Sequence, residues 1–159
     1  MAIHRDDSVP HRLRLDLPAA HSAGRMARQV VRQFAEREGL SADEVGTLEL
    51  VASELLSNAV DHGGGRSAME ESELEGDVRM HLALGVSESG WELCVSDQGG
   101  GRPDDVAHYL DGEVPPDLED ERGRGFYLLA QMVDELRVDR SRDGKGLAFV
   151  ARKSARRKV

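Results

Sequence analysis

Two polar side chains in the segment LELVASELLSNAVDHGGG, residues 48–65, have types and a spacing that could support chemistry. Glu54 and Asn58 are four residues apart, so on a helix they lie one turn from each other. The periodicity of the apolar residues puts both at the border of the apolar face, where a packed helix can line a cleft. A carboxylate there can act as a general base, and an amide oxygen can bind Mg²⁺, which prefers oxygen ligands and phosphates. Ordinary polar residues beside a packed face would give the same pattern.

The segment VSDQGGG, residues 95–101, places a carboxylate beside three glycines. Asp97 follows a predicted strand, and an ionised carboxylate only accepts hydrogen bonds, which suits the amino group of a base such as adenine. Glycine allows a close backbone approach that a side chain would prevent. A plain turn is the alternative, because aspartate and glycine are both common in turns.

The segment GRGFYLLAQMVDEL, residues 123–136, begins a predicted helix with Gly123 and Gly125. A helix N-terminus presents free N–H groups and a positive dipole end, which together favour a phosphate. Arg122 and Arg124 could add charge-assisted hydrogen bonds. A flexible hinge is the alternative. The order of the three segments is a more specific signal of a nucleotide site than any one segment. Without such a site, three unrelated local patterns would have to follow one another by chance.

The elements that must position these residues can be predicted from periodicity and capping signals. Period-two alternation predicts strands, and helical spacing of apolar residues predicts helices. Ser41 and Glu44 form a capping box that starts the helix carrying Glu54, and Gly39 caps the preceding helix. The predicted order is strand 13–17, helix 19–38, helix 41–62, mobile loop 66–77, strands 78–86 and 91–97, loop 98–125 with a short helix at 104–110, helix 126–136, and strands 136–140 and 146–152.

Paired strands with few helices predict an α+β fold. We expect a two-layer α/β sandwich with a mainly antiparallel, mixed sheet and about three helices on one face. The length of 159 residues fits one domain. We assign residues 1–11 to a flexible N-terminus, 12–152 to the domain and 153–159 to a basic tail.

Charge and composition argue against several other classes. The formal net charge of −9 argues against direct nucleic-acid binding, which relies on lysine and arginine. The single cysteine, Cys94, cannot form an internal disulfide, and its alternating surroundings are typical of a buried structural thiol. No apolar run approaches the roughly 20 residues that cross a bilayer, and the first residues lack a signal-peptide core. We therefore expect a cytoplasmic protein without membrane association.

The three chemical segments together resemble the Bergerat-fold (GHKL) ATPase superfamily, which includes gyrase, Hsp90, histidine kinases and MutL. ELLSNAVDHG is similar to its N box, and DQGGG is similar to its first glycine box, with Asp97, Gly99 and Gly101. GRGFYLL is similar to the second glycine box, with Phe126 where leucine is commoner. The chain most resembles the RsbW/SpoIIAB-like branch of anti-sigma-factor serine/threonine kinases, over residues 12–152.

This resemblance implies a site for ATP and Mg²⁺. Asp97 would bind the adenine amino group, Asn58 would hold Mg²⁺, Glu54 would activate the attacking hydroxyl, and 102–122 would form a lid. The full set of implied nucleotide-binding residues beside the base Glu54 is Asn58, His62, Asp97, Gly99, Gly101, Arg122, Gly123, Arg124, Gly125 and Phe126. The implied partners are a sigma factor and a STAS-domain anti-anti-sigma factor that is phosphorylated on serine or threonine, and a homodimer is possible.

Two departures from the family pattern keep an alternative open. Gly146 stands where a threonine is expected near Asp97, and the lid contains the acidic run DGEVPPDLEDE. Both favour a second hypothesis, a non-catalytic nucleotide-binding or nucleotide-free anti-sigma module. A sensor histidine kinase fragment is disfavoured, because none of the six histidines lies in a His-Glu/Asp-x-x-x-Pro context.

Overall fold

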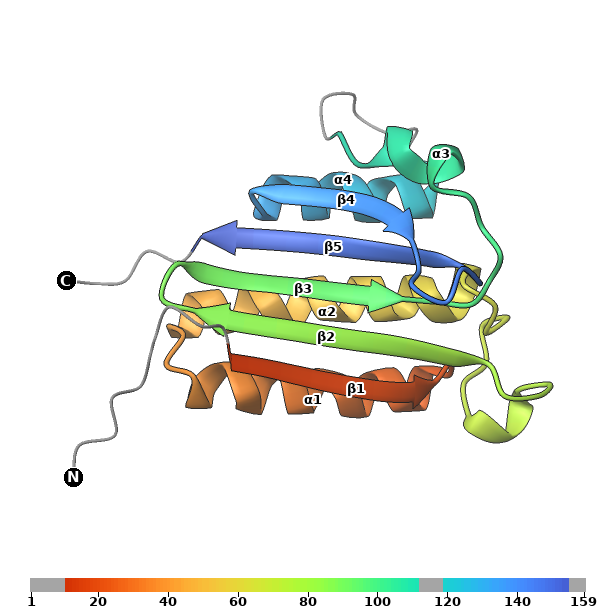
Figure 1. Ribbon diagram of the computed structural model, residues 1–159, viewed down its shortest axis with the longest axis horizontal. Coiled ribbons are helices and arrows are strands. Elements are labelled where there is room, and N and C mark those ends of the chain that lie inside the picture. Colours follow the sequence, from red (N-terminus) through yellow and green to blue (C-terminus); the bar gives the residue numbers. More distant parts are fainter. Residues whose placement is uncertain (1–10, 112–118, 155–159) are drawn as a thin grey trace.

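The computed structural model describes residues 11–111 and 119–154. Within them the elements are β1 (His11–Pro18), α1 (His21–Arg37), α2 (Ala42–His62), the 3-10 turn η1 (Glu71–Glu73), β2 (Arg79–Ser87), β3 (Gly90–Ser96), α3 (Pro103–Val106), the 3-10 turn η2 (Ala107–Tyr109), α4 (Glu121–Met132), β4 (Glu135–Arg140) and β5 (Leu147–Ser154). The strands form one sheet, and α1, α2 and α4 lie against one of its faces (Figure 1). This arrangement confirms the predicted two-layer α+β sandwich.

The strands have the spatial order β1-β2-β3-β5-β4. Every neighbouring pair among the described strands is antiparallel, so the sheet is not mixed as expected. Alternate residues of β2 are buried toward the helices, as period-two patterning predicts. Asp97 directly follows β3 and packs against Gly63, the residue that ends α2. One edge of the sandwich therefore joins two of the three chemical segments.

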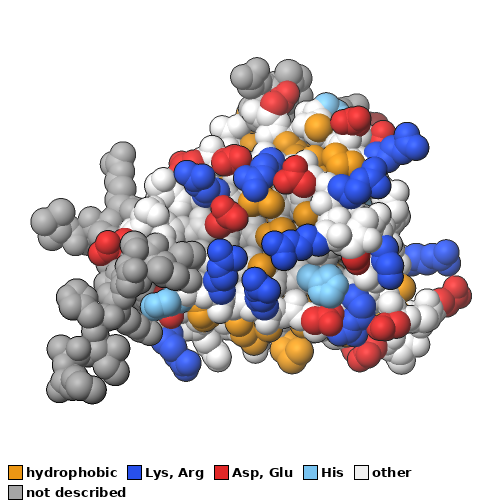
Figure 2. All heavy atoms as spheres, in the orientation of Figure 1, with side chains coloured by type: hydrophobic (Ala, Val, Ile, Leu, Met, Phe, Trp, Pro, Cys, Tyr) orange, Lys and Arg blue, Asp and Glu red, His pale blue; other side chains and the backbone are white. Residues whose placement is uncertain are grey.

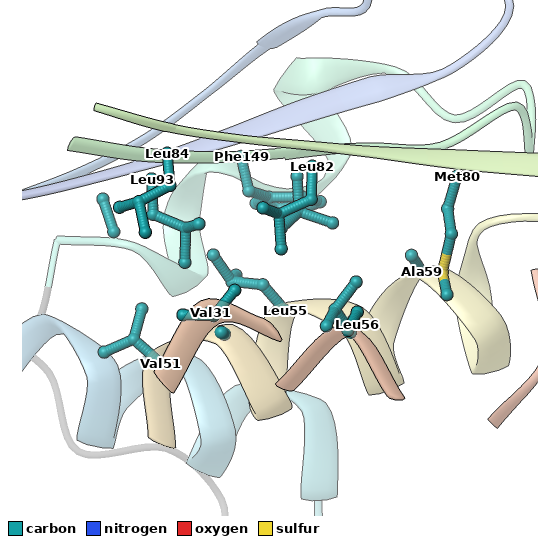
Figure 3. Packing of buried hydrophobic residues seen from close by; sticks show 14 of the residues in the cluster. Val31, Val51, Leu55, Leu56, Ala59, Met80, Leu82, Leu84, Leu93 and Phe149 are labelled. Carbon is teal, nitrogen blue, oxygen red and sulfur yellow. The ribbon is translucent and has the colours of Figure 1, made fainter. Parts of the chain in front are cut away.

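The core lies between the sheet and the helices and is mainly aliphatic. Figure 3 shows helix residues facing strand residues across this layer, among them Val31, Leu55 and Leu56 opposite Leu82, Leu84 and Phe149. All six are almost completely buried. Burying each such side chain contributes about 1.5–3 kcal/mol, so the layer fixes α2 rigidly relative to the sheet.

Helix α2 begins as its capping signal predicts. The Ser41 hydroxyl accepts a hydrogen bond from the Glu44 N–H at 3.2 Å. The Glu44 carboxylate, however, accepts hydrogen bonds from Trp91 Nε1 (3.2 Å) and from Lys153 Nζ (3.1 Å). It therefore ties the start of α2 to β3 and β5, and only the serine half of the predicted capping box forms.

The face of the sheet opposite the helices is lined by charged and small residues. Figure 2 shows basic and acidic side chains interspersed over this face, with apolar surface between them. Arg79 contacts Asp16 at 3.0 Å, and Arg137 contacts Glu135 at 3.1 Å and Asp139 at 3.2 Å. These charges therefore pair locally on the face. Cys94 is half-buried here, and burial raises the pKa of its thiol.

Several boundaries differ from expectation. Segment 66–77, expected to be mobile, contains η1, and the N–H groups of His21 and Ser22 donate to the carbonyls of Ala68 (2.8 Å) and Met69 (2.9 Å). It thus satisfies free N–H groups at the start of α1. Strand β5 continues to Ser154, into the segment assigned to the tail, and β1 starts at His11. None of the helices within the described ranges combines the length and apolar composition of a membrane-crossing segment.

Candidate functional site

Glu54 lies on the part of α2 that faces the first turn of α4. Its side chain is exposed, and Oε2 lies 3.3 Å from where a β-carbon on Gly125 would stand. The two helices run in opposite directions behind the sheet (Figure 1). Because residue 125 has no side chain, the backbone of α4 comes close to the carboxylate. Glu54 is therefore both accessible from outside and adjacent to the second glycine segment.

Asn58 lies one turn further along α2 and is only 9% exposed. Its Oδ1 accepts a hydrogen bond from Arg122 Nε at 3.0 Å. A guanidinium only donates, so this contact fixes which side of the amide carries the oxygen. Nδ2 of Asn58 is buried and has no partner among the described residues. An unpaired buried donor costs about 1–3 kcal/mol, which suits a position where a ligand supplies the acceptor.

Arg122 brings a partly desolvated positive charge between α2 and α4. Its guanidinium lies 5.7 Å from the centre of the Phe126 ring, within cation–π range. Burial lowers the pKa of Arg122, which still remains protonated at neutral pH. Partial desolvation, and then the charge of Arg122, lower the pKa of His62 at the end of α2. The Arg122 guanidinium therefore donates a hydrogen bond to Asn58 and also lowers the pKa of His62.

Asp97 is the most deeply buried of the predicted polar site residues, with 3% exposure. Its Oδ1 accepts hydrogen bonds from the N–H groups of Gly99 (3.0 Å) and Leu147 (3.2 Å). Burial raises the pKa of Asp97, and the two backbone hydrogen bonds oppose that effect. Within the described ranges, none of the hydrogen bonds found ends on Oδ2. The two bonds to Oδ1 orient the carboxylate and leave Oδ2 able to accept from another donor.

Two glycines allow α2 and the segment after β3 to meet. A β-carbon on Gly63 would lie 2.5 Å from Asp97 Cβ and 2.6 Å from the Ala59 carbonyl oxygen. A β-carbon on Gly99 would lie 2.6 Å from the Gly63 carbonyl carbon. All three distances are shorter than real side chains tolerate, so this junction requires glycine on both sides.

We expect Gly63→Ala to destabilise the protein by about 2–3 kcal/mol, because the added methyl group overpacks a junction that is already filled. Gly46→Ala is the matched control on the same helix: it is exposed, and nothing lies within 4 Å of its added β-carbon. That variant should be stabilised by about 0.5–1 kcal/mol through helix propensity. Urea unfolding measures both, and equal effects of the two substitutions would contradict the packing described.

The turn between β4 and β5 supports Asp97 from the other side. Asp143 accepts hydrogen bonds from Lys145 N (2.9 Å), Ser141 Oγ (2.7 Å) and Gln98 Nε2 (3.1 Å). These donors, the Lys145 amide first, lower the pKa of Asp143 to about 2. The carboxylate thus links the turn to the residue that follows Asp97.

This network has a defined pH dependence. The pKa of Asp143 is lower in the folded protein than the ordinary value of about 3.9. Its contribution to the free energy of unfolding is therefore complete above about pH 4 and is lost as the pH falls toward 2. Asp143→Asn should be less stable than the parent chain at pH 6, and the difference should shrink between pH 4 and pH 2. A difference measured by urea unfolding that stays constant over this range would refute the assignment.

The first turn of α4 is capped by its own chain. Asp120 Oδ1 accepts a hydrogen bond from the Gly123 N–H at 3.1 Å. Tyr109, from η2 in the predicted lid, stacks on Phe126 with ring centres 6.2 Å apart, and the neighbouring Asp120 raises the pKa of its hydroxyl. Phe126 in turn stacks on Phe149 at 5.1 Å. The described part of the lid is therefore packed against α4.

The structure brings most of the predicted site residues to one edge of the sandwich. Glu54, Asn58, Asp97, Gly99, Arg122, Gly123 and Gly125 border this edge, with His62 close by. Arg124 points outward, where its nearest acidic partner is Glu121 at 4.0 Å. Phe126 is a core residue beneath Arg122. In the first glycine segment the left-handed conformation belongs to Gly100, while Gly101 contacts Leu147. Part of the acidic lid, residues 112–118, lies outside the described residues.

Gly146, where the family pattern has threonine, is required by packing in this chain. A β-carbon on Gly146 would overlap Asp97 Oδ1, so no side chain fits there. The Leu147 N–H, which bonds Asp97, is the contribution of this strand to the site. Sequence reasoning also missed Gly63, Asp120 and Tyr109. Only Asp120 had a local signal, since aspartate is a favoured N-cap residue.

Comparison with known proteins finds relatives over most of the chain. Residues 17–151 match the family of histidine kinase-like ATPase domains. Serine-protein kinase RsbW of Bacillus subtilis is 29% identical over 131 residues, covering 79% of this chain and 76% of the relative. Anti-sigma F factor of Priestia megaterium is 30% identical over 133 residues, covering 82% of this chain and 84% of the relative.

Solved structures share the fold. The structure of the RsbU and RsbW domains of a Mycobacterium tuberculosis protein matches with a TM-score of 0.57 and 18% identity; 92% of this chain covers 33% of that longer chain. A chain of the SiaB-SiaC complex from Pseudomonas aeruginosa matches with a TM-score of 0.65 and 13% identity, over 91% of this chain and 89% of that chain. At these identities the likeness concerns the fold alone.

Proposed function

The chain belongs to the histidine kinase-like ATPase domain family, and from this premise we propose that it is an anti-sigma-factor serine/threonine kinase. The relatives named RsbW and anti-sigma F factor support the resemblance to that branch. The protein uses ATP as the phosphate donor, and we assign the serine or threonine acceptor to a partner protein.

The order of polar groups along α2 carries this proposal. Asp97 packs at Gly63, Asn58 lies about a turn and a half earlier, and Glu54 lies one turn before that. From Glu54 to Gly63 the helix spans about 13 Å. A nucleoside triphosphate has the same sequence of parts: a base with an amino donor, a metal-binding phosphate chain, and a terminal phosphate. Each part would meet a side chain suited to it.

The roles of the residues follow from their chemistry. Asp97 would accept the amino hydrogen of adenine on Oδ2, while Oδ1 stays bonded to Gly99 and Leu147. Glu54 would accept the proton of the incoming hydroxyl. The oxygen of that hydroxyl then bonds to the γ-phosphorus while the bond between the γ-phosphorus and the β-phosphate oxygen breaks, and ADP leaves. The exposure of Glu54 suits a hydroxyl delivered by another protein.

The metal would depend on Asn58 and on the nucleotide. No three His, Cys, Asp or Glu side chains gather into a metal site within the described ranges. This fits Mg²⁺, which takes few protein ligands and binds largely through phosphates and water. Asn58 Oδ1 is an oxygen ligand of the right type, although it accepts from Arg122 in this structure. When bound, the ion would neutralise charge on the transferring phosphate.

We infer the partners from the resemblance to the RsbW/SpoIIAB-like branch. The chain would hold a sigma factor away from RNA polymerase and phosphorylate a STAS-domain antagonist, and it could form a homodimer. The direct test is to incubate the full chain with Mg·ATP and the STAS-domain protein encoded nearest to it, then map phosphate by mass spectrometry. Phosphoserine or phosphothreonine on the antagonist is expected. Nucleotide binding without any transfer would favour the non-catalytic module.

A further inference from the structure

Segment 120–122 places two charged side chains on the two groups that a metal–nucleotide complex would use. Asp120 lies on the N-terminal N–H groups of α4, and Arg122 lies on the amide oxygen of Asn58. Both contacts are made by residues at the start of one helix, two positions apart. Their chemistry matches that of the groups such a complex would bring: an anion on a helix N-terminus, and a cation on an oxygen ligand.

The position of Asp120 is the one expected for a phosphate. A helix N-terminus binds anions through free N–H groups and its dipole. Asp120 Oδ1 takes the Gly123 N–H at 3.1 Å, and Oδ2 lies 3.1 Å from where a β-carbon on Gly123 would stand. The carboxylate therefore covers the glycine that the resemblance assigns to phosphate binding, and its charge would repel a second anion there.

The position of Arg122 is the one expected for a divalent cation. Its Nε donates to Asn58 Oδ1, the oxygen assigned to the metal. The guanidinium is held over the Phe126 ring and is partly removed from water, so its place is built by packing as well as by charge. On the same amide, buried Nδ2 has no partner among the described residues, although Asn58 is 91% buried. The amide is thus only half satisfied by the chain itself.

The lid is connected to the same pair. Tyr109 lies beside Asp120, which raises the pKa of its hydroxyl, and it stacks on Phe126, the ring that also supports Arg122. Val106 and Leu110, on either side, are buried in the core. The described part of the lid therefore contacts both Asp120 and the ring beneath Arg122, and the core residues hold it in place.

We propose that Asp120 and Arg122 are built-in substitute ligands that compete with a bound metal–nucleotide complex, Asp120 in the place of a phosphate and Arg122 in the place of the metal ion. Binding of Mg²⁺ with nucleotide displaces both, and one movement of the first turn of α4 is enough because the two residues share that turn. This inference rests on the proposed function and specifies how its site is regulated.

The phosphate half of the proposal is tested by binding of Mg·ADP to the full chain, measured by calorimetry. Asp120→Asn keeps an N-cap of equal quality but removes the competing charge. It should bind Mg·ADP about tenfold more tightly than the parent, the equivalent of one charge-assisted contact. Glu121→Gln is the matched control: it removes the same charge from the next residue, whose side chain is 91% exposed. We expect it to change the affinity by less than about twofold.

The metal half is tested by the Mg²⁺ concentration that half-saturates ADP binding. Arg122→Gln removes the cation that competes for Asn58, and it should lower this concentration about tenfold. Arg32→Gln, an exposed arginine of α1 away from the site, should leave it unchanged. Equal affinities for Asp120→Asn and Glu121→Gln, with an unchanged Mg²⁺ requirement in Arg122→Gln, would overturn this inference and leave the kinase proposal standing. Failure of every variant to bind nucleotide, Asp120→Asn included, would contradict both.

Discussion

Glu54→Ala should reduce phosphate transfer to the antagonist at least about 1,000-fold, within the range by which general bases accelerate reactions. Nucleotide affinity should change by less than about twofold, because Glu54 is exposed beside α4 and is assigned to the incoming hydroxyl, not to the base or the metal. Glu54→Gln should lose as much activity, since an amide preserves the shape but cannot take the proton. Single-turnover transfer of radiolabelled phosphate measures the loss.

The matched control for this experiment is Glu49→Gln. Glu49 lies on the same helix but faces α1, where it pairs with Arg28 at 3.6 Å and with Arg32 at 4.0 Å. This variant undergoes the same chemical change and should transfer phosphate at the rate of the parent chain. A Glu54→Gln variant as active as Glu49→Gln would show that another group removes the proton.

Asp97→Asn should weaken ATP binding about 100-fold while leaving the fold intact. The asparagine oxygen can still accept from Gly99 and Leu147, so the hydrogen bonds that hold the segment remain possible. The group that replaces Oδ2 is now a donor, and it would face the amino donor of adenine. A site built for one hydrogen-bond pattern discriminates strongly against the reversed pattern, because buried polar groups are left unpaired.

Calorimetry with Mg·ATP measures this loss, and circular dichroism with thermal unfolding establishes that the variant is folded. An affinity equal to that of the parent chain would place the base elsewhere.

The elements with strong local signals were predictable. Helix α2 starts after Ser41 and ends at His62, as the cap and the glycine run indicate. The start of α4 was not predictable in the same way, since Gly123 and Gly125 are poor helix formers. The helix nevertheless begins at Glu121, because Asp120 caps it and Phe126 and Leu129 anchor it in the core. Packing overrides propensity there.

The three segments that carry the site residues were also found from spacing and resemblance. The contact between the end of α2 and the segment after β3 was not. That Gly63 and Gly146 must be glycine depends on Asp97, which approaches both from a distant part of the chain. The contact between Arg122 and Asn58 spans 64 residues, so no local pattern could reveal it. The reason for Gly146 in place of the family's threonine was hidden in the same way, because the space around that position is defined only by the fold.

We propose that Glu54, Asn58 and Asp97 meet one Mg·ATP, and a crystal structure with Mg²⁺ and a non-hydrolysable ATP analogue would test this. We expect adenine hydrogen-bonded to Asp97, the metal on Asn58 Oδ1 with Arg122 displaced, and the γ-phosphate in front of Glu54. A nucleotide bound at another surface, or one that leaves Asn58 and Asp97 in separate pockets, would contradict it.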